Sequence, residues 1–488
     1  MDRATPPPPP LITSALGLGL EAFVAVRASV AAGIADARAA FELILSAPSA
    51  DWGFLVLSGV EPLVDALERL RPRADELEWL ESTGAIDGPT RRRLAESRFA
   101  CDLDAAPEGS VVFPGEAVVT VEGPFWQSQL VGGLVQAAIT DATVIATRFA
   151  RLSLASGGAD IVEHGSATAH RLGGVPLLAR AAFIGGARAT TNALAARRYG
   201  IPVTATQPVS FDVAVGGEDK AIRAWLAASP HGCVLRLDAA RATVVLPRLV
   251  AAVRERVNAS GAGFDERKLA IEVPEGDRAG LARAIERAFA AGGLTPPPVV
   301  VSGDVDEHLA LELRGASKAV RAYAVAADSA PGIARLSRYE LVAIEQGGSW
   351  SPRIRLATDA ASSSDPGRKL LVRYSDASGR PVADVAHSMS ERLQRATGGR
   401  FIDRSTGLGA RLVASASAPL RSAAMRAGKR ASTPEGTSLL RDRAAEAVQS
   451  LDEGHRRISS PSRYPVGVTQ PLATLRTDLI ARASEGAP

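Results

Sequence analysis

The stretch "RAAFIGGARATTNALAARRYGIPVTATQPVS", residues 180–210, decides how the middle of the chain folds. It belongs to an Ala-rich run that predicts a helix over 176–199. Gly200 and Pro202 interrupt that helix, because glycine and proline are both poor helix formers. The next residues, 201–205, are short and apolar and predict a buried strand.

The chain then opens into a loop, where an α/β enzyme usually places its chemistry. Residues 207–210 of this loop are Gln-Pro-Val-Ser, which include no acid, base or histidine. The loop therefore occupies the place of an active site but carries little that could react.

Strand and helix patterns continue to alternate beyond this loop. The predicted strands, after 201–205, are 233–237, 269–273, 298–302 and a weaker one at 321–326, and the predicted helices are 217–228, 243–258, 279–291 and 305–314. Repeated strand–helix units imply a parallel sheet or barrel whose loops after each strand form the functional face.

The flanking regions have other patterns. Residues 11–45 predict a helix and then a strand at 40–44, and a long helix is expected over 127–155. Alternating apolar residues and Gly/Pro turns predict a β-hairpin at 109–122 and another within 357–379. Residues 403–437 are rich in Ser, Ala and Arg without clear periodicity, and helices are expected over 436–457 and after Thr469.

Composition limits the class of protein. The 488 residues are 46% hydrophobic and 22% charged with a net charge of +3, as in a globular chain. The sequence has no basic stripe with interleaved aromatic residues, so it does not indicate a nucleic-acid partner. The best apolar run near the N-terminus, which follows a Pro-rich leader at 1–10, is interrupted by Glu21 and Arg27, so no membrane span is expected.

The cysteine count is low. Only Cys101 and Cys233 occur, which favours a reducing, cytoplasmic location. The pair His231 and Cys233 matches no common zinc spacing, so no metal site is assigned to it.

Several phrases carry a resemblance to a known family. They are "PEGSVVFPGEAVVTVEGPFWQSQL" (107–130), "TVIATRFAR" (143–151), "RAAFIGGARATTNALAARRYGIPV" (180–203), "VSGDVDE" (301–307), "DPGRK" (365–369) and "RYPVGVT" (463–469). From Leu11 to the C-terminus the chain resembles the nicotinate phosphoribosyltransferases. The implied fold is α/β, an irregular type II phosphoribosyltransferase α/β barrel with a smaller N-terminal α/β domain and C-terminal hairpin and helical additions.

The resemblance also implies a domain plan and an activity. A Pro-rich leader at 1–10 would precede an N-terminal domain at 11–125, a barrel at 126–345 and a C-terminal segment at 346–488 that packs on both. The family joins nicotinate to phosphoribosyl pyrophosphate with Mg²⁺, usually coupled to ATP, as a salvage step towards NAD. It implies a homodimer, with Mg²⁺ and ATP as cofactors only if the family activity persists.

The family's active-site motifs are largely altered. The position that the resemblance gives to the phosphorylated histidine is Val209, and valine cannot be phosphorylated. The two arginines of the family's "FGLRR" are absent from 164–168, the arginine of "RIDSGD" is Glu272, and the phosphate loop "GVGT" is Ala-Val-Ala-Ala at 324–327. The early "TDLY" corresponds to Thr-Ser-Ala-Leu at 13–16, without Asp or Tyr.

No catalytic residue is assigned, and the remaining polar positions are candidates for binding a substrate. They are Glu163, His164, Thr190, Thr191, Asn192, Gln207, Ser210, Asp238, Gly276, Asp277, Ser302 and Asp304. A phosphate or ribose at a helix start would suit 190–192, but such residues also cap helices.

Other candidates have two interpretations as well. Residues 302–307 could cap the helix near 305 or hold a metal, and capping is favoured. His164 and His170 are expected to be structural, Glu163 is a candidate for a changed site, and Asp238 and Asp277, without a basic partner, could bind a cation or an amine.

Three functional hypotheses follow. The first is a catalytically impaired homologue that binds a protein partner or regulates an active paralogue. The second is a divergent transferase with a different base or donor. The third is a working nicotinate phosphoribosyltransferase with unusual motifs, against which the lost electrostatic groups weigh.

Overall fold

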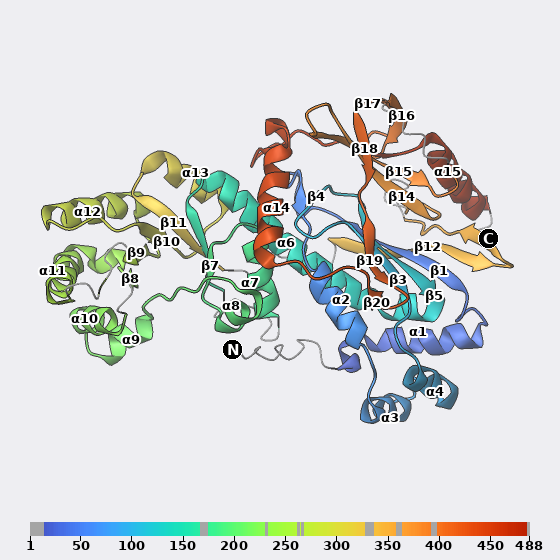
Figure 1. Ribbon diagram of the computed structural model, residues 1–488, viewed down its shortest axis with the longest axis horizontal. Coiled ribbons are helices and arrows are strands. Elements are labelled where there is room, and N and C mark those ends of the chain that lie inside the picture. Colours follow the sequence, from blue (N-terminus) through green and yellow to red (C-terminus); the bar gives the residue numbers. More distant parts are fainter. Residues whose placement is uncertain are drawn as a thin grey trace. The chain divides into compact units, whose positions relative to one another are not determined.

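The computed structural model describes residues 14–165, 174–229, 233–260, 264, 268–326, 336–357, 364–391 and 398–485. The chain forms two compact units (Figure 1). Unit 1 comprises Met1–Thr147 and Ala330–Pro488, and unit 2 comprises Arg148–Ser329. The boundaries predicted at 125/126 and 345/346 differ from these, and the N-terminal and C-terminal parts of the chain share one unit.

Two sheets build most of unit 1. The first has the order β13-β12-β1-β5-β3-β19-β20. Its strands are β1 (Arg38–Leu45), β3 (Asp102–Ala105), β5 (Ala117–Pro124), β12 (Ser337–Gln346), β13 (Ser349–Pro352), β19 (Ser422–Arg426) and β20 (Lys429–Arg430). The second has the order β17-β16-β21-β15-β14-β18. Its strands are β14 (Lys369–Ser375), β15 (Pro381–Ser388), β16 (Gly398–Asp403), β17 (Gly409–Val413), β18 (Ala416–Pro419) and β21 (Val466–Val468).

Helices and one small strand pair complete unit 1. The helices are η1 (Ala15–Gly17), α1 (Leu20–Ala31), α2 (Val60–Arg69), α3 (Ala74–Ser82), α4 (Gly88–Glu96), α5 (Phe125–Leu130), α14 (Thr437–Ser450), η6 (Glu453–Arg456) and α15 (Gln470–Glu485). The pair is β2 (Leu55–Val56) and β4 (Val111–Val112). The main apolar core joins Leu43 and Val121 of the first sheet to Leu371 and Ala386 of the second.

The hairpin predicted at 109–122 is wrong. Its two halves do form strands, but β4 pairs with β2, whereas β5 pairs with β1 and β3. The turn residues were interpreted correctly, yet each strand finds a distant partner that buries its apolar face. The hairpin predicted within 357–379 is displaced along the chain: β14 lies in this range, but β15, with which it pairs antiparallel, begins only at Pro381.

Unit 2 holds a parallel sheet in the order β7-β6-β11-β10-β9-β8. Its strands are β6 (Asp160–Glu163), β7 (Ala189–Thr190), β8 (Val234–Arg236), β9 (Ala270–Val273), β10 (Val299–Val301) and β11 (Val320–Val325). Its helices are α7 (Val175–Ile184), α8 (Ala193–Tyr199), α9 (Val209–Ala214), α10 (Glu218–Ala228), η2 (Ala239–Arg241), α11 (Ala242–Ser260), α12 (Arg278–Ala291) and α13 (Glu307–Ala316). The long helix α6 (Gly132–Ser156) begins in unit 1 and ends in unit 2.

The opening stretch folds differently from the prediction. The helix expected over 176–199 is two helices, α7 and α8, separated by strand β7. The buried strand expected at 201–205 is also wrong, because this segment makes only one isolated bridge, from Val203 to Thr190, and the next residue, Thr206, makes another to Val234. These bridges lie at the two edge strands, β7 and β8, so the segment links both edges of the sheet. Val203 itself is 67% exposed.

Other features of the sequence can be placed on this frame. The strands predicted at 233–237, 269–273, 298–302 and 321–326 correspond to β8, β9, β10 and β11. The segment 403–437, which showed no periodicity, contains four short strands. Cys101 and Cys233 are both free and buried, while His231 lies outside the described residues. In the part of the chain that the structure describes, no helix is both long and apolar enough to cross a membrane.

Candidate functional site

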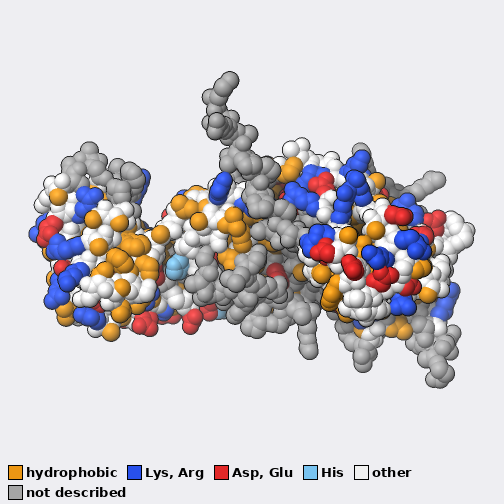
Figure 2. Space-filling model, turned by 90° about the horizontal axis from the view of Figure 1, so that it is seen from below, with side chains coloured by type: hydrophobic (Ala, Val, Ile, Leu, Met, Phe, Trp, Pro, Cys, Tyr) orange, Lys and Arg blue, Asp and Glu red, His pale blue; other side chains and the backbone are white. Residues whose placement is uncertain are grey.

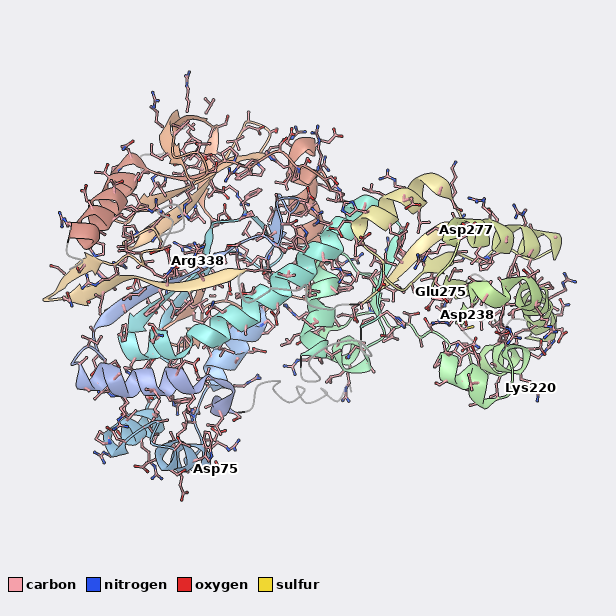
Figure 3. All side chains as sticks on the ribbon, turned by 180° about the vertical axis from the view of Figure 1, so that it is seen from behind. Asp75, Lys220, Asp238, Glu275, Asp277 and Arg338 are labelled. Atoms are coloured by element: carbon pink, nitrogen blue, oxygen red, sulfur yellow. The ribbon has the colours of Figure 1, made fainter. Side chains whose placement is uncertain are left out.

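The candidate site is the carboxyl edge of the unit 2 sheet. Because the strands are parallel, the residues that end or follow them meet at one edge. Glu163 ends β6, Asp238 follows β8, Asp277 follows β9 and Ser302 follows β10. Asp238 and Asp277 are visible together with Glu275 at this edge (Figure 3).

Glu163 is held by neutral donors. Its carboxylate accepts hydrogen bonds from the Gly165 amide at 2.6 Å and from the Thr190 hydroxyl. The side chain is buried, with the residue 1% exposed. Burial raises the pKa of Glu163, and the hydrogen bonds from Thr190 and Gly165 only partly oppose that rise. Glu163 therefore supports the ends of β6 and β7, and its carboxylate is occupied by the protein's own donors.

A second buried carboxylate belongs to Glu272 on β9. Its Oε1 accepts a hydrogen bond from the Ser302 hydroxyl at 2.6 Å, and Nη1 of Arg236 lies 4.0 Å away. Its Oε2 is buried without a hydrogen-bond partner. The residue is 1% exposed. The Ser302 hydroxyl therefore donates to Glu272, and the cap of the following helix is Asp306.

The expectation that Asp238 has no basic partner is wrong. Nε of Arg236 donates to Asp238 at 3.0 Å. The two residues are two positions apart, so they leave the end of β8 on the same side, and this spacing was the signal that the sequence analysis overlooked. The charge of Asp238 is consequently neutralised by Arg236, which lies in the strand just before it.

Asp277 has a structural role as the N-cap of α12. Its Oδ1 accepts a hydrogen bond from the Gly280 amide at 2.8 Å. Gly276 precedes it with a φ of +82°, and a Cβ there would lie 2.7 Å from that of Ala239. Glycine is required at this turn for both reasons. The structure thus accounts for Gly276 and Asp277 without a ligand.

Helix capping also explains two other positions. Asn192 Oδ1 accepts from the Ala195 amide at 2.8 Å and caps α8, while Asp306 caps α13 through the Leu309 amide at 2.8 Å. The Thr190 hydroxyl accepts from the Asn192 amide, and the amide of Thr191 donates to the Glu163 carbonyl. Asp304 is exposed between β10 and α13. The favoured capping interpretation of 302–307 is confirmed at Asp306.

Residues 207–210 are poor in reactive groups, as expected, but the loop predicted there ends at Pro208. Val209 begins the short helix α9 and is 43% exposed. The Gln207 amide donates to Asp212, and its Oε1 is buried without a hydrogen-bond partner. Ser210 is exposed. Figure 2 shows apolar side chains gathered on one face of unit 2, whose exposed apolar residues include Val203 and Val213.

The remaining motif positions are only partly described. His164 is half-buried, and its amide donates to the Val325 carbonyl at 2.8 Å. His170 and residues 166–168 lie outside the described residues. Ala324 belongs to an apolar cluster with Val300 and Ala322, so methyl groups line the strand that leads to the former phosphate loop.

Arginines near this edge bind the protein's own oxygen atoms. Nη2 of Arg278 donates to the carbonyl of Pro274 at 2.7 Å and to that of Ser302 at 3.3 Å. Arg148 reaches the carbonyls of Ala326 and Val305. The sequence analysis did not single out these arginines, although Arg148 lies within the phrase at 143–151 and Arg278 directly follows Asp277, because only the fold shows which carbonyls they reach. Among the described residues, no group of three or more His, Cys, Asp or Glu could hold a metal ion.

Comparisons with known proteins agree with this fold. Residues 23–139 match the N-terminal domain of nicotinate phosphoribosyltransferase (NAPRTase), and residues 368–476 match its C-terminal domain. The chain is 31% identical over 344 residues to the nicotinate phosphoribosyltransferase pncB1 of Mycobacterium tuberculosis (strain ATCC 25618 / H37Rv), covering 68% of this chain and 72% of that protein. It is 25% identical over 512 residues to the nicotinate phosphoribosyltransferase of Bos taurus, covering 93% and 94%.

Solved structures give the same result for the fold. The crystal structure of human nicotinic acid phosphoribosyltransferase aligns with a TM-score of 0.78 at 22% identity, covering 95% of this chain and 99% of that one. The nicotinate-nucleotide pyrophosphorylase of Pyrococcus furiosus aligns with a TM-score of 0.62 at 17% identity, covering 89% and 95%. The predicted type II phosphoribosyltransferase fold is confirmed.

Proposed function

The chain belongs to the nicotinate phosphoribosyltransferase family, and from this premise we propose that it is impaired or inactive in the family's ATP-coupled transfer of phosphoribose to nicotinate. The single observation that carries the proposal is Glu272. The resemblance implies an arginine at this position, and the structure has a buried carboxylate there that is bonded to Ser302.

The reaction explains why this change matters. Displacing pyrophosphate from ribose requires the site to hold a highly charged donor and to stabilise the leaving group with cations and amides. A carboxylate at the same edge repels the donor. Arg236 does not reverse the charge, because it already pairs with Asp238 at 3.0 Å and faces Glu272 at 4.0 Å.

Two further positions support the same proposal. Val209 has no group that ATP could phosphorylate, although it is exposed at the start of α9. Two of the retained carboxylates are engaged by the protein itself, since Asp277 caps α12 and Asp238 pairs with Arg236, and no group of three or more His, Cys, Asp or Glu among the described residues could hold a metal ion. The described residues therefore do not fit Mg²⁺ or ATP in the family's manner, and we derive no step through either.

A turnover assay tests the proposal. The full chain is supplied with nicotinate, phosphoribosyl pyrophosphate, Mg²⁺ and ATP, and nicotinate mononucleotide is quantified beside the Mycobacterium tuberculosis relative. We expect a rate at least about 1000-fold below that of the relative, as the loss of electrostatic groups predicts. A rate within about tenfold would contradict the proposal, because such a small loss is less than one such group supplies.

The Val209→His variant sharpens the assay. Restoring histidine alone should give no ATP-dependent phosphate labelling and no product, since the phosphate-binding groups would still be missing. Labelling of this variant would show that the nucleotide site persists, which the proposal excludes.

A second candidate function is a divergent transferase with another donor. It is favoured by one observation, the unbonded Oε2 of Glu272 inside the sheet edge. Under this hypothesis Glu272→Gln would abolish whatever turnover a substrate screen reveals. We also propose a regulatory role through a protein partner, a cytoplasmic location and a homodimer. The family resemblance supports the location and the homodimer.

A further inference from the structure

A cavity of about 610 Å³ is lined entirely by residues of unit 1. It is formed where the loops after β1 and β4 meet β12, the turn after β16 and the segment before β21. Its polar and aromatic lining includes Trp52, Phe113, Arg338, Arg404, Arg463 and Tyr464. Its volume lies within the range typical of small-molecule sites.

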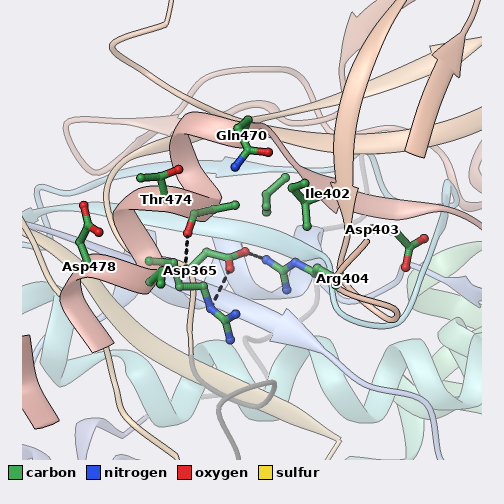
Figure 4. A pocket seen from close by; sticks show the side chains of 12 residues that line it. Asp365, Ile402, Asp403, Arg404, Gln470, Thr474 and Asp478 are labelled. Carbon is green, nitrogen blue, oxygen red and sulfur yellow. Dashed lines mark hydrogen bonds and ion pairs between the residues drawn. The ribbon is translucent and has the colours of Figure 1, made fainter. Parts of the chain in front are cut away.

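The lining has a strongly one-sided charge. Among the described residues, it contains the three arginines and no Asp or Glu. A neighbouring pocket of about 440 Å³ shares Arg404 but is lined by Asp365, Asp403 and Asp478 as well as Arg476 (Figure 4). The two hollows therefore differ in sign, and only the larger one favours an anion.

Arg404 is fixed between the two pockets. Its Nη1 donates to the Gly115 carbonyl at 2.8 Å, and its guanidinium pairs with Asp365, as Figure 4 shows. Burial lowers the pKa of Arg404 to about 10, so the group is still a cation at neutral pH. Its Nε has no hydrogen-bond partner. Arg404 is thus a fixed cation in the wall of the cavity.

The other two arginines have different partners. Nε of Arg338 lies 3.2 Å from Glu340, a carboxylate that Arg355 also contacts. Arg463 is exposed at the cavity. Glu340 and Asp365, the partners of Arg338 and Arg404, lie outside the lining, and the charge of Arg463 also acts on Asp403 of the neighbouring pocket. Arg463 is therefore the most exposed cation of the lining.

The aromatic wall is rigid. Phe113 and Tyr464 stack with ring centroids 3.5 Å apart and an interplanar angle of 5°. The Tyr464 hydroxyl donates to Asp384 at 3.1 Å, which fixes the pair further. Trp52 is half-buried beside them and offers an indole at the cavity. Phe113 and Tyr464 are 1% and 4% exposed, so they form a rigid wall, and Trp52 is the ring that we expect to stack on an aromatic ligand.

We propose that this cavity binds a phosphorylated small molecule with an aromatic ring, of the nucleoside monophosphate class. The guanidinium groups hold the phosphate, because their planar donor arrangement matches phosphate oxygens. Trp52 stacks on the ring. The inference goes beyond the proposed function and does not depend on whether the barrel in unit 2 transfers phosphoribose.

Titration calorimetry of the full chain with AMP tests the proposal, with inorganic pyrophosphate as a second probe. We expect saturable AMP binding that Arg463→Gln or Arg338→Gln weakens at least about tenfold, as the loss of a charged hydrogen bond predicts. The matched control is Arg457→Gln, which removes the same charge from an exposed residue six positions away that does not line the cavity.

Comparison of AMP with pyrophosphate distinguishes binding of the aromatic ring from binding of the phosphate alone. Trp52→Ala should weaken AMP binding and leave pyrophosphate binding unchanged. Thermal unfolding midpoints of the arginine variants should stay near that of the wild type, whereas Trp52→Ala should lower the midpoint because Trp52 packs against the main core, and its unchanged pyrophosphate binding would show that the cavity is still formed. The proposal is overturned if AMP gives no heat at about 5 mM, a concentration that would detect even millimolar affinity. It is also overturned if Arg463→Gln and Arg457→Gln bind AMP equally, which would place the AMP elsewhere, or if only pyrophosphate binds.

Discussion

Glu42 in unit 1 and Glu272 in unit 2 are both strand carboxylates that are 1% exposed, but their partners differ. Glu42 lies 2.9 Å from the Lys369 ammonium and 3.2 Å from the Arg421 guanidinium. Glu272 has the Ser302 hydroxyl as its hydrogen-bond donor and a guanidinium only at 4.0 Å.

The difference appears in the titration of the buried groups. Burial acts to raise the pKa of Glu42, but the charges of Lys369 and Arg421 outweigh it and lower that pKa. In unit 2, burial raises the pKa of Glu163, because its donors are a hydroxyl and an amide. Glu42 is therefore compensated by two cations, whereas Glu163 at the sheet edge of unit 2 is held by neutral donors.

The largest expected effect is in unit 1. Glu42→Gln removes the carboxylate that compensates two buried cations, which should cost roughly 3–5 kcal/mol of unfolding free energy. Urea denaturation measures the change. Asp104→Asn is the control, because the ion pair of Asp104 with Arg426 is 40% and 49% exposed and should contribute little. Equal midpoints for the two variants would mean that the buried network is not compensated as described.

An intermediate effect is expected at the unit 2 edge. Ser302→Ala leaves Glu272 without its hydroxyl donor and should destabilise the protein by roughly 1–3 kcal/mol. Ser210→Ala, at an exposed position in the 207–210 loop, should leave the midpoint unchanged. If Ser302→Ala is as stable as the wild type, Arg236 must already satisfy Glu272, and the contrast between the units disappears.

A smaller effect separates capping from binding. Asp277→Ala should cost about 1 kcal/mol, while Asp277→Asn should cost much less because asparagine also caps helices. Differential scanning calorimetry would compare the two variants. A larger loss for Asp277→Asn than for Asp277→Ala would show that the charge, and so a ligand or cation, matters more than the cap.

The smallest expected effect is a change with pH. Because the folded-state pKa of Glu163 is raised, its stabilisation is complete below the unfolded pKa of about 4.3 and is lost as the pH rises through the folded value. Glu163→Gln cannot ionise and keeps hydrogen-bonding groups for Gly165 and Thr190. Its stability relative to the wild type should therefore increase as the pH rises above about 4.3, the pKa of an unfolded Glu, through the raised folded-state value. If the difference in stability between Glu163→Gln and the wild type decreased as the pH rose, the raised pKa of Glu163 would be contradicted.

Part of this structure could be predicted from the sequence. The strands of the unit 2 sheet follow apolar runs bounded by Gly and Pro, and Asp306 caps a helix at the expected place. The strand predicted at 201–205 is wrong because an apolar run does not show whether it forms a full strand or single bridges. The false hairpin at 109–122 failed for a related reason, since turn residues do not specify which distant strand becomes the partner.

The site was predictable to a lesser degree. Altered motifs identified Glu272 and Val209, but the pairing of Asp238 with Arg236 depends on side-chain directions at the end of β8. The cavity in unit 1 could not be predicted, because Trp52, Arg338 and Arg463 come together only when strands from both ends of the chain share one unit.

The central claim is that the edge of the unit 2 sheet no longer holds the donor. Calorimetric titration of the full chain with Mg²⁺ and phosphoribosyl pyrophosphate tests it most directly, with Arg463→Gln as background to exclude binding in the unit 1 cavity. The account predicts no saturable heat up to about 2 mM donor, which corresponds to an affinity too weak for catalysis at ordinary concentrations. Saturable binding at micromolar donor in this background would contradict the account and show that other residues replace the lost arginines.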